Sequence, residues 1–365
     1  MKNTFGTSVA VTLFGESHGA MIGAVLDGMA PGIPVDEEFI ASRMALRRSV
    51  DALSTPRREA DAVRIVSGVV NGRTTGTPIT FLIENSDTKS QHYDILSEVA
   101  RPGHADYTAY EKYHGFADTR GGGHFSGRIT AGLVAAGSVA TAALERLGIR
   151  IGTHIAACGG VSDRPFDNVE ADVLTLQDLP FAVLDEVRGE QMKAAILAAK
   201  AEGDSIGGIL ETAVTGLPAG VGEPWFDTLE GVLAHMLFGI PAIKGVEFGL
   251  GFGYASLRGS EANDPFRVEN GKIVTATNHC GGILGGISNG MPITFRCAVK
   301  PTPSIYQAQE TVNFKSNENT VLDIKGRHDP AIFHRARIVV DSATALVLCD
   351  MLAQRFGTDY LAGNV

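Results

Sequence analysis

Cysteine is scarce in this chain of 365 residues, and the four that occur, Cys158, Cys280, Cys297 and Cys349, form no C-x-x-C pair. Their spacing indicates neither a zinc knuckle nor a redox motif, so we expect four reduced, mostly buried thiols. Positive charge is also in deficit, since the net charge is −10. This argues against a general nucleic-acid binder, although arginines can still cluster locally.

Long hydrophobic runs are missing too: we identify no apolar run of membrane-spanning length. The N-terminus, MKNTFGTSVAVTLFGES, lacks the long apolar region and small-residue cleavage site of a secretory signal. The simplest expectation is a cytoplasmic protein that does not enter a membrane. No repeat, low-complexity tract or linker divides the chain, whose length permits one large domain or two.

The chain does contain helix and strand patterns, and they do not alternate as they would in a doubly wound sheet. Helices are expected at 36–48, 131–148, 185–203, 226–239 and 341–357. Strand-like runs lie at 8–14, 61–70, 77–84, 206–216, 243–252, 266–276 and 291–300. We expect Asp36 to cap the first helix, and Asp227 with Glu230 to form a capping pair at the fourth. The order predicts an α/β protein of the α+β type, with helices packed against antiparallel sheets.

The segment FGESHG, residues 14–19, matches the G-x-S-x-G pattern of a hydrolase nucleophile elbow, with Ser17 as the nucleophile. An elbow requires a helix after the serine, whereas the following GAMIGAVLDGMAPGIP is rich in glycine and ends in a proline-rich loop. His18 is also poorly placed as a base, because neighbouring side chains diverge. Two alternatives to the hydrolase remain: a glycine-rich turn, or a serine and histidine that bind one polar ligand together.

Residues 101–128, RPGHADYTAYEKYHGFADTRGGGHFSGR, combine histidines, arginines and three consecutive glycines. Histidines ten residues apart match no compact metal motif, so a metal site is the weaker hypothesis. Glycines allow backbone N–H groups to approach a ligand, and arginines provide forked donors for phosphate and carboxylate. Similar polar turns occur at 278–290, 300–305 and 325–330, and arginine pairs at 47–48 and 57–58. Together they favour a small ligand with more than one anionic group.

Several motifs together resemble the chorismate synthase family. They are FGESHG, the arginine pair at 47 and 48, TTGTPI, RPGHADYT, RGGG followed by SGR, EGDSIGG, PAGVGEP, KGVEFG, NHCGGILGGISNG, KPTPSI and GRHDP. They follow the family's order from residue 14 to about 330, and such an ordered set is far more specific than any single motif.

The resemblance implies a carbon–oxygen lyase with one domain, residues 1–365, in which helices are sandwiched between antiparallel sheets, assembled as a homotetramer. The family converts 5-enolpyruvylshikimate 3-phosphate into chorismate by a 1,4-anti elimination of phosphate and a ring hydrogen, in the shikimate pathway of aromatic amino acid biosynthesis. It requires reduced FMN without net redox change. Some members reduce their own flavin with NADPH, and others depend on an external flavin reductase; the sequence leaves both open.

Residue roles follow from the same resemblance. His18 protonates the departing phosphate, His104 protonates or stabilises the reduced flavin, and Asp329 works with the flavin in removing the ring proton. Substrate-binding positions are Ser17, Arg47, Arg48, Arg101, Arg128 and Arg327. Flavin-binding positions are His124, Phe125, Ser126, Ala242, Gly285, Lys300, Pro301, Thr302, Pro303, Ser304 and Arg327. No metal is expected.

The chain departs from a common family pattern at three places. Where many members have GGGRSSAR, this chain has GGGHFSGR, so His124 and Phe125 replace an arginine and a serine. Pro241 stands where asparagine is frequent, and an arginine and a proline after the first arginine pair are replaced. Arg57 or Arg58 is a candidate to supply the missing charge. An FMN-binding carrier protein without turnover remains an alternative function, beside the hydrolase with RGGGH as its oxyanion loop.

Overall fold

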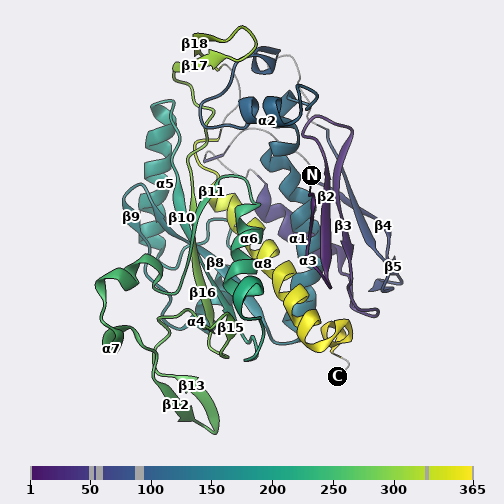
Figure 1. Ribbon diagram of the computed structural model, residues 1–365, viewed down its shortest axis with the longest axis vertical. Coiled ribbons are helices and arrows are strands. Elements are labelled where there is room, and N and C mark those ends of the chain that lie inside the picture. Colours follow the sequence, from purple (N-terminus) through teal and green to yellow (C-terminus); the bar gives the residue numbers. More distant parts are fainter. Residues whose placement is uncertain (1, 49–52, 55–60, 87–93, 325–328, 364–365) are drawn as a thin grey trace.

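A computed structural model describes residues 2–48, 53–54, 61–86, 94–324 and 329–363. Figure 1 shows a layer of helices between two five-stranded sheets. The first sheet has the order β1 (Thr4–Phe5), β2 (Ala10–Gly15), β3 (Met21–Asp27), β7 (Ile79–Glu84) and β4 (Val63–Ser67). The second has the order β11 (Ile243–Phe248), β16 (Ile293–Val299), β10 (Gly208–Thr215), β8 (Arg150–Cys158) and β9 (Val161–Ser162).

All strand pairs within these two sheets are antiparallel. Four further two-stranded hairpins pair β5 (Val69–Val70) with β6 (Arg73–Thr74), β12 (Phe266–Glu269) with β13 (Lys272–Thr275), β14 (Ile283–Leu284) with β15 (Ile287–Ser288), and β17 (Gln309–Asn313) with β18 (Glu318–Leu322). The helices are α1 (Glu37–Arg47), α2 (Asp106–Lys112), α3 (Thr130–Arg146), α4 (Val169–Leu176), α5 (Glu186–Ala201), α6 (Leu229–Phe238), α7 (Gly259–Ala262) and α8 (Phe333–Phe356). The expected α+β class, with helices between antiparallel sheets, is confirmed.

Helices α3 and α8 form the centre of the helical layer (Figure 1). Helix α3 packs against β3 and β7 of the first sheet, and α8 packs against β8 and β10 of the second. The two helices approach closely at Gly137, where an added Cβ would lie 2.4 Å from the Cβ of Ser342. Glycine at this position therefore permits the contact, and buried residues of both sheets and both helices form one hydrophobic cluster.

The expectation that no apolar run has membrane-spanning length was wrong. By length and composition alone, the helical segment Gly127–Arg146 is long and apolar enough to cross a membrane. However, 89% of its apolar stretch is buried inside the protein, and 14 of the 17 residues of α3 itself are buried. The segment is a core helix whose apolar surface is covered by the first sheet and by α8.

Most expected elements are confirmed, but several boundaries differ. Asp36 caps α1 as expected, since its carboxylate accepts hydrogen bonds from the backbone N–H groups of Glu38 and Phe39. At α6 the capping residue is Thr228, whose hydroxyl accepts from the N–H of Gly231, so the predicted Asp227–Glu230 capping pair was wrong. Helix α8 begins at Phe333 and not at residue 341.

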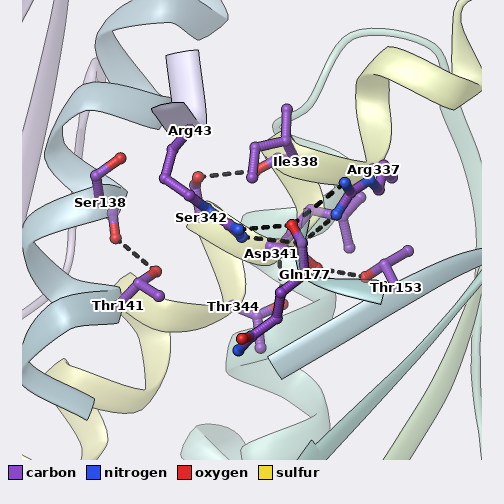
Figure 2. Close-up of polar contacts among 12 residues, drawn as sticks. Arg43, Ser138, Thr141, Thr153, Gln177, Arg337, Ile338, Asp341, Ser342 and Thr344 are labelled. Atoms are coloured by element: carbon purple, nitrogen blue, oxygen red, sulfur yellow. Dashed lines mark hydrogen bonds and ion pairs between the residues drawn. The ribbon is translucent and has the colours of Figure 1, made fainter. Parts of the chain in front are cut away.

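The early start of α8 places a carboxylate in the middle of the helix, where it forms a buried charge cluster (Figure 2). Asp341 accepts hydrogen bonds from Thr153 of β8 at 2.6 Å and from Arg43 and Arg337 at 3.5 and 3.4 Å. Burial raises the pKa of Asp341 against the attraction of the two guanidinium groups. Burial also lowers the pKa of Arg337 to about 10. The cluster links α1, α8 and β8.

A second buried polar group lies on β8. The ring of His154, with a side chain only 1% exposed, lies 2.8 Å from Asp163 through Nδ1 and 2.9 Å from Glu211 through Nε2. Burial lowers the pKa of His154, but the hydrogen bonds to both carboxylates outweigh burial and raise it overall. A ring with a carboxylate at each nitrogen is suited to the protonated state, in which both nitrogens donate.

Candidate active site

The FGESHG segment contains the last two residues of β2 and the first part of the turn to β3, and the two strands pair directly in antiparallel register. A nucleophile elbow needs a strand followed by a helix, so the structural context of the hydrolase hypothesis is absent. The turn packs on the glycine-rich run instead. The backbone N–H of Ser17 donates to the carbonyl of Gly123 at 3.0 Å, and Nδ1 of His124 lies 2.8 Å from the carbonyl oxygen of Gly15.

Gly121 allows the turn and the glycine-rich run to meet. Its φ is 58°, a backbone conformation that residues other than glycine seldom adopt. A Cβ at this position would lie 2.2 Å from Cε1 and 2.3 Å from Nδ1 of His18, and 3.0 Å from the hydroxyl of Ser17. His18 is 8% exposed, and Ser17 is fully buried. The missing side chain at 121 therefore provides the space in which the ring of His18 lies.

The second histidine of the site is held by a carboxylate two residues further on. Nδ1 of His104 lies 2.7 Å from Asp106, which also accepts from the Nε and a terminal nitrogen of Arg101 at 2.8 and 2.7 Å. Burial would raise the pKa of Asp106, but these hydrogen bonds from Arg101 and His104 outweigh it and lower the pKa well below its usual value. A terminal nitrogen of Arg101 also lies 3.0 Å from Nδ1, so Asp106 and Arg101 together orient the ring, and an anionic Asp106 favours the tautomer with the proton on Nδ1.

Two arginines expected to bind substrate share one carboxylate. Arg47, at the end of α1, and Arg128, just before α3, each form an ion pair with Asp61. Burial would raise the pKa of Asp61, but the two guanidinium groups lower it overall. Burial and the neighbouring Arg128 lower the pKa of Arg47, against the opposing effect of Asp61. One anion thus serves two buried cations, and the group retains an excess positive charge.

Of these groups, Arg47, Asp61, Arg101, His104, Gly121, His124 and Arg128 line a cavity of about 1140 Å³. Five arginines and two lysines line it against two aspartates; they are Arg47, Arg48, Arg101, Arg128, Arg335, Lys244, Lys300, Asp61 and Asp329. Typical small-molecule pockets have volumes of about 300–1,000 Å³, so this cavity is slightly larger than the upper end of that range. Its charge favours anionic ligands. Among the described residues, no group of three or more His, Cys, Asp or Glu side chains could hold a metal ion.

Comparison with known proteins decides the family. The family model for chorismate synthase matches residues 9–353. The chain belongs to the chorismate synthase family. It is 47% identical to chorismate synthase of Thermococcus gammatolerans over 350 residues, which cover 96% of this chain and 97% of the relative. It is also 47% identical to chorismate synthase of Dehalococcoides mccartyi over 359 residues, or 98% of both chains. A solved structure, "Crystal Structure of Chorismate Synthase", matches with a TM-score of 0.76 and 28% identity over 98% of each chain.

As a member of the chorismate synthase family the protein is a carbon–oxygen lyase, and most residues marked by the family resemblance line the cavity. These are Arg47, Arg48, Arg101, His104, His124, Phe125, Ser126, Arg128, Ala242, Lys300, Thr302, Pro303, Ser304 and Asp329. Ser17 and His18 do not line it but lie directly behind Gly121, which does. Arg327, Arg57 and Arg58 lie outside the described residues.

Gly285 and Pro301 are expected flavin contacts that do not line the cavity. Gly285 lies in the turn between β14 and β15, and Pro301 follows the cavity-lining Lys300. Arg101 lines the cavity, and two nitrogens of its guanidinium group also donate to Asp106.

Sequence reasoning missed Asp61, Asp106, Lys244 and Arg335. Asp106 carried a signal, since it lies two residues after a histidine in the same motif. Arg335, which lines the cavity and pairs with Asp329 at 2.6 Å, belongs to the first turn of α8, which was expected to start later. Asp61 carried no such signal in the sequence, because no local pattern connects it with Arg47 or Arg128.

Proposed function

We propose that this protein converts 5-enolpyruvylshikimate 3-phosphate into chorismate and phosphate, with reduced FMN as its cofactor. The observation that carries the proposal is the cavity itself, in which an excess of cations lies next to His104 and to the run that covers His18. The substrate has one phosphate and two carboxylates, which match such a lining. The reaction belongs to the shikimate pathway.

The residues fit a flavin as well. Within the described part of the chain, the hydroxyl of Thr302 is buried and has no hydrogen-bond partner, although it belongs to the cavity-lining segment. Ala242, also in the lining, has a φ of 76°, so its backbone is held in a conformation that is unusual for alanine. His124, Phe125, Ser126, Lys300, Thr302 and Ser304 would hold the cofactor. Reduced FMN, when bound, supplies the transient electron that eases departure of phosphate.

The chain's own residues bind the anions and move protons in this proposal. His18 would give a proton to the departing phosphate, and His104, whose Nδ1 lies 2.7 Å from Asp106, would protonate or stabilise the reduced flavin. Asp329 takes part in removing the ring proton, while Arg47, Arg48, Arg101, Arg128 and Arg327 bind the phosphate and carboxylates. His124 and Phe125 contribute backbone contacts in place of the more usual arginine and serine.

We also propose that residues 1–365 form a single domain, that four such chains assemble as a homotetramer, and that the protein is cytoplasmic. The exposed aromatic side chains of the isolated chain support assembly, because Trp225, Phe226 and Phe252 are 84%, 93% and 88% exposed. Sedimentation velocity on the purified protein measures the assembly. Reduction of FMN by NADPH in the purified protein would show that it needs no external flavin reductase.

One assay tests the function. Purified protein is incubated anaerobically with 5-enolpyruvylshikimate 3-phosphate and chemically reduced FMN, and chorismate and free phosphate are measured. Equal amounts of both products are expected. Flavin binding without chorismate would instead indicate a flavin carrier, and covalent labelling of Ser17 by a serine-directed probe would restore the hydrolase hypothesis.

A further inference from the structure

We propose that Asp61 determines ligand specificity, as an internal anion that occupies Arg47 and Arg128 until a phosphate group displaces it. This inference rests on the proposed function in one respect, because in the proposed reaction the phosphate group that displaces Asp61 belongs to the substrate. The two arginines and Asp61 all line the cavity, so ligand and Asp61 have access to the same donors.

Both oxygens of Asp61 are in use. One accepts from Arg128 and the other from Arg47, and the side chain of Asp61 is only 2% exposed. The side chains of Arg47 and Arg128 are 12% and 4% exposed. An anion that reaches these guanidinium groups from the cavity comes close to the carboxylate, and two like charges at this distance repel strongly in a buried site. The ligand and Asp61 therefore compete.

The arginines are the fixed partners in this exchange. Arg128 also donates to the side-chain oxygen of Asn85 at 3.0 Å and to the carbonyl of Glu84 at 3.1 Å, so it stays in place without Asp61. Arg47 lies one turn after Arg43, which the buried charge cluster of Figure 2 holds. Among the described residues, the ion pairs of Asp61 are with these two arginines, so its displacement is the simplest way to open the site.

The exchange discriminates between anions. A singly charged carboxylate that replaces Asp61 gains no charge over the group it displaces, whereas a phosphate brings about 1.5 to 2 negative charges and three acceptor oxygens. Two guanidinium groups therefore bind the phosphate more strongly than the carboxylate. Asp61 thus excludes weakly charged ligands, because its displacement costs more than they gain, which is specificity by repulsion of the wrong ligand.

The test is Asp61→Asn, because asparagine tolerates the φ of 50° found at this position. Binding of inorganic phosphate and of acetate is measured by calorimetry without flavin, in chloride buffers of equal ionic strength. We expect the dissociation constant of phosphate to fall by about 5- to 150-fold, the usual range for two coupled ligands. The preference for phosphate over acetate should decrease. Asp172→Asn is the matched control, since Asp172 pairs with Arg164 at 2.6 Å outside the cavity lining.

Phosphate binding that is unchanged or weaker in Asp61→Asn would overturn the proposal, because Asp61 would then hold the arginines in place for the ligand. An increase of the same size in Asp172→Asn would overturn it too, since net charge alone would explain the effect. If Asp61→Asn is too unstable for calorimetry, melting temperatures decide: phosphate should stabilise it more than wild type, and an equal response to phosphate and chloride refutes competition. Failure of the proposed function would appear separately, as wild-type protein that makes no chorismate.

Discussion

Gly121→Ala should disable the site by displacing the ring of His18, although the substitution removes no group that takes part in the chemistry. The new Cβ would lie 2.2 Å from Cε1 of His18, whereas carbon atoms in contact are normally about 3.5–4.0 Å apart. The ring of His18 or the glycine-rich run must therefore retreat by more than about 1 Å, and a misplacement of that size can lower a rate by about 10²-fold. Alanine at a φ of 58° adds backbone strain of about 1–2 kcal/mol.

The assay is anaerobic chorismate formation with reduced FMN, together with urea denaturation for the free energy of unfolding. Gly148→Ala is the matched control. Gly148 follows α3 with a φ of 79°, and no atom lies within 4 Å of the position that an added Cβ would take, so alanine there adds strain without a clash. Gly121→Ala should lose about 10²-fold in kcat, and Gly148→Ala should lose stability alone. Wild-type turnover in Gly121→Ala, or equal loss of turnover in both variants, would refute the reasoning.

Three further predictions concern Asp106, Gly137 and His154. Asp106→Asn should lower kcat by up to about 10²-fold and change its pH profile, because His104 loses the anion that holds its Nδ1 proton; an unchanged profile would contradict this role. Gly137→Ala should lower the free energy of unfolding by about 1–3 kcal/mol in urea, since its methyl group would overpack the contact between α3 and α8. His154→Gln should be less stable than wild type at low pH. Because the pKa of His154 is raised in the folded state, its protonation stabilises the wild-type protein fully below the ordinary pKa of 6.5. This stabilisation is lost as pH rises through the folded-state pKa. The difference in unfolding free energy between wild type and His154→Gln should therefore become smaller as pH rises.

The helices and strands that could be predicted are those that bury one face, because their hydrophobic residues then recur with a regular period. Helix α1 has an acidic first turn, a capping aspartate and a basic end, and it was found within one residue of its bounds. The strand β8 was missed, because RIGTHIAAC is buried on both faces and shows no alternation. The start of α8 was misplaced for a related reason: Asp341 resembles a helix cap in sequence, and only the tertiary ion pairs with Arg43 and Arg337 explain a carboxylate inside the helix.

Site residues that belong to sequence motifs could be predicted. Contacts between residues that are distant in the sequence could not. His104 and the glycine-rich run stand in recognisable segments, so resemblance to a family located them. The position of Asp61 between Arg47 and Arg128 depends on three separate elements, and no sequence pattern encodes such a contact. Likewise, the motif containing His18 suggested a ligand, but the closeness of Gly121 to the ring is a property of the folded chain alone.

The burial of α3 has a consequence for the order in which the chain is made. One side of this apolar helix packs on β3 and β7, both of which lie within the first 84 residues and are made before it. The other side packs on α8, which spans Phe333–Phe356 and is among the last segments to leave the ribosome. In a growing chain the side of α3 that faces α8 therefore stays uncovered until residues 333–356 have been made. Chaperones that recognise apolar helices would find their target here, and a nonsense codon before residue 333 would leave that surface permanently exposed.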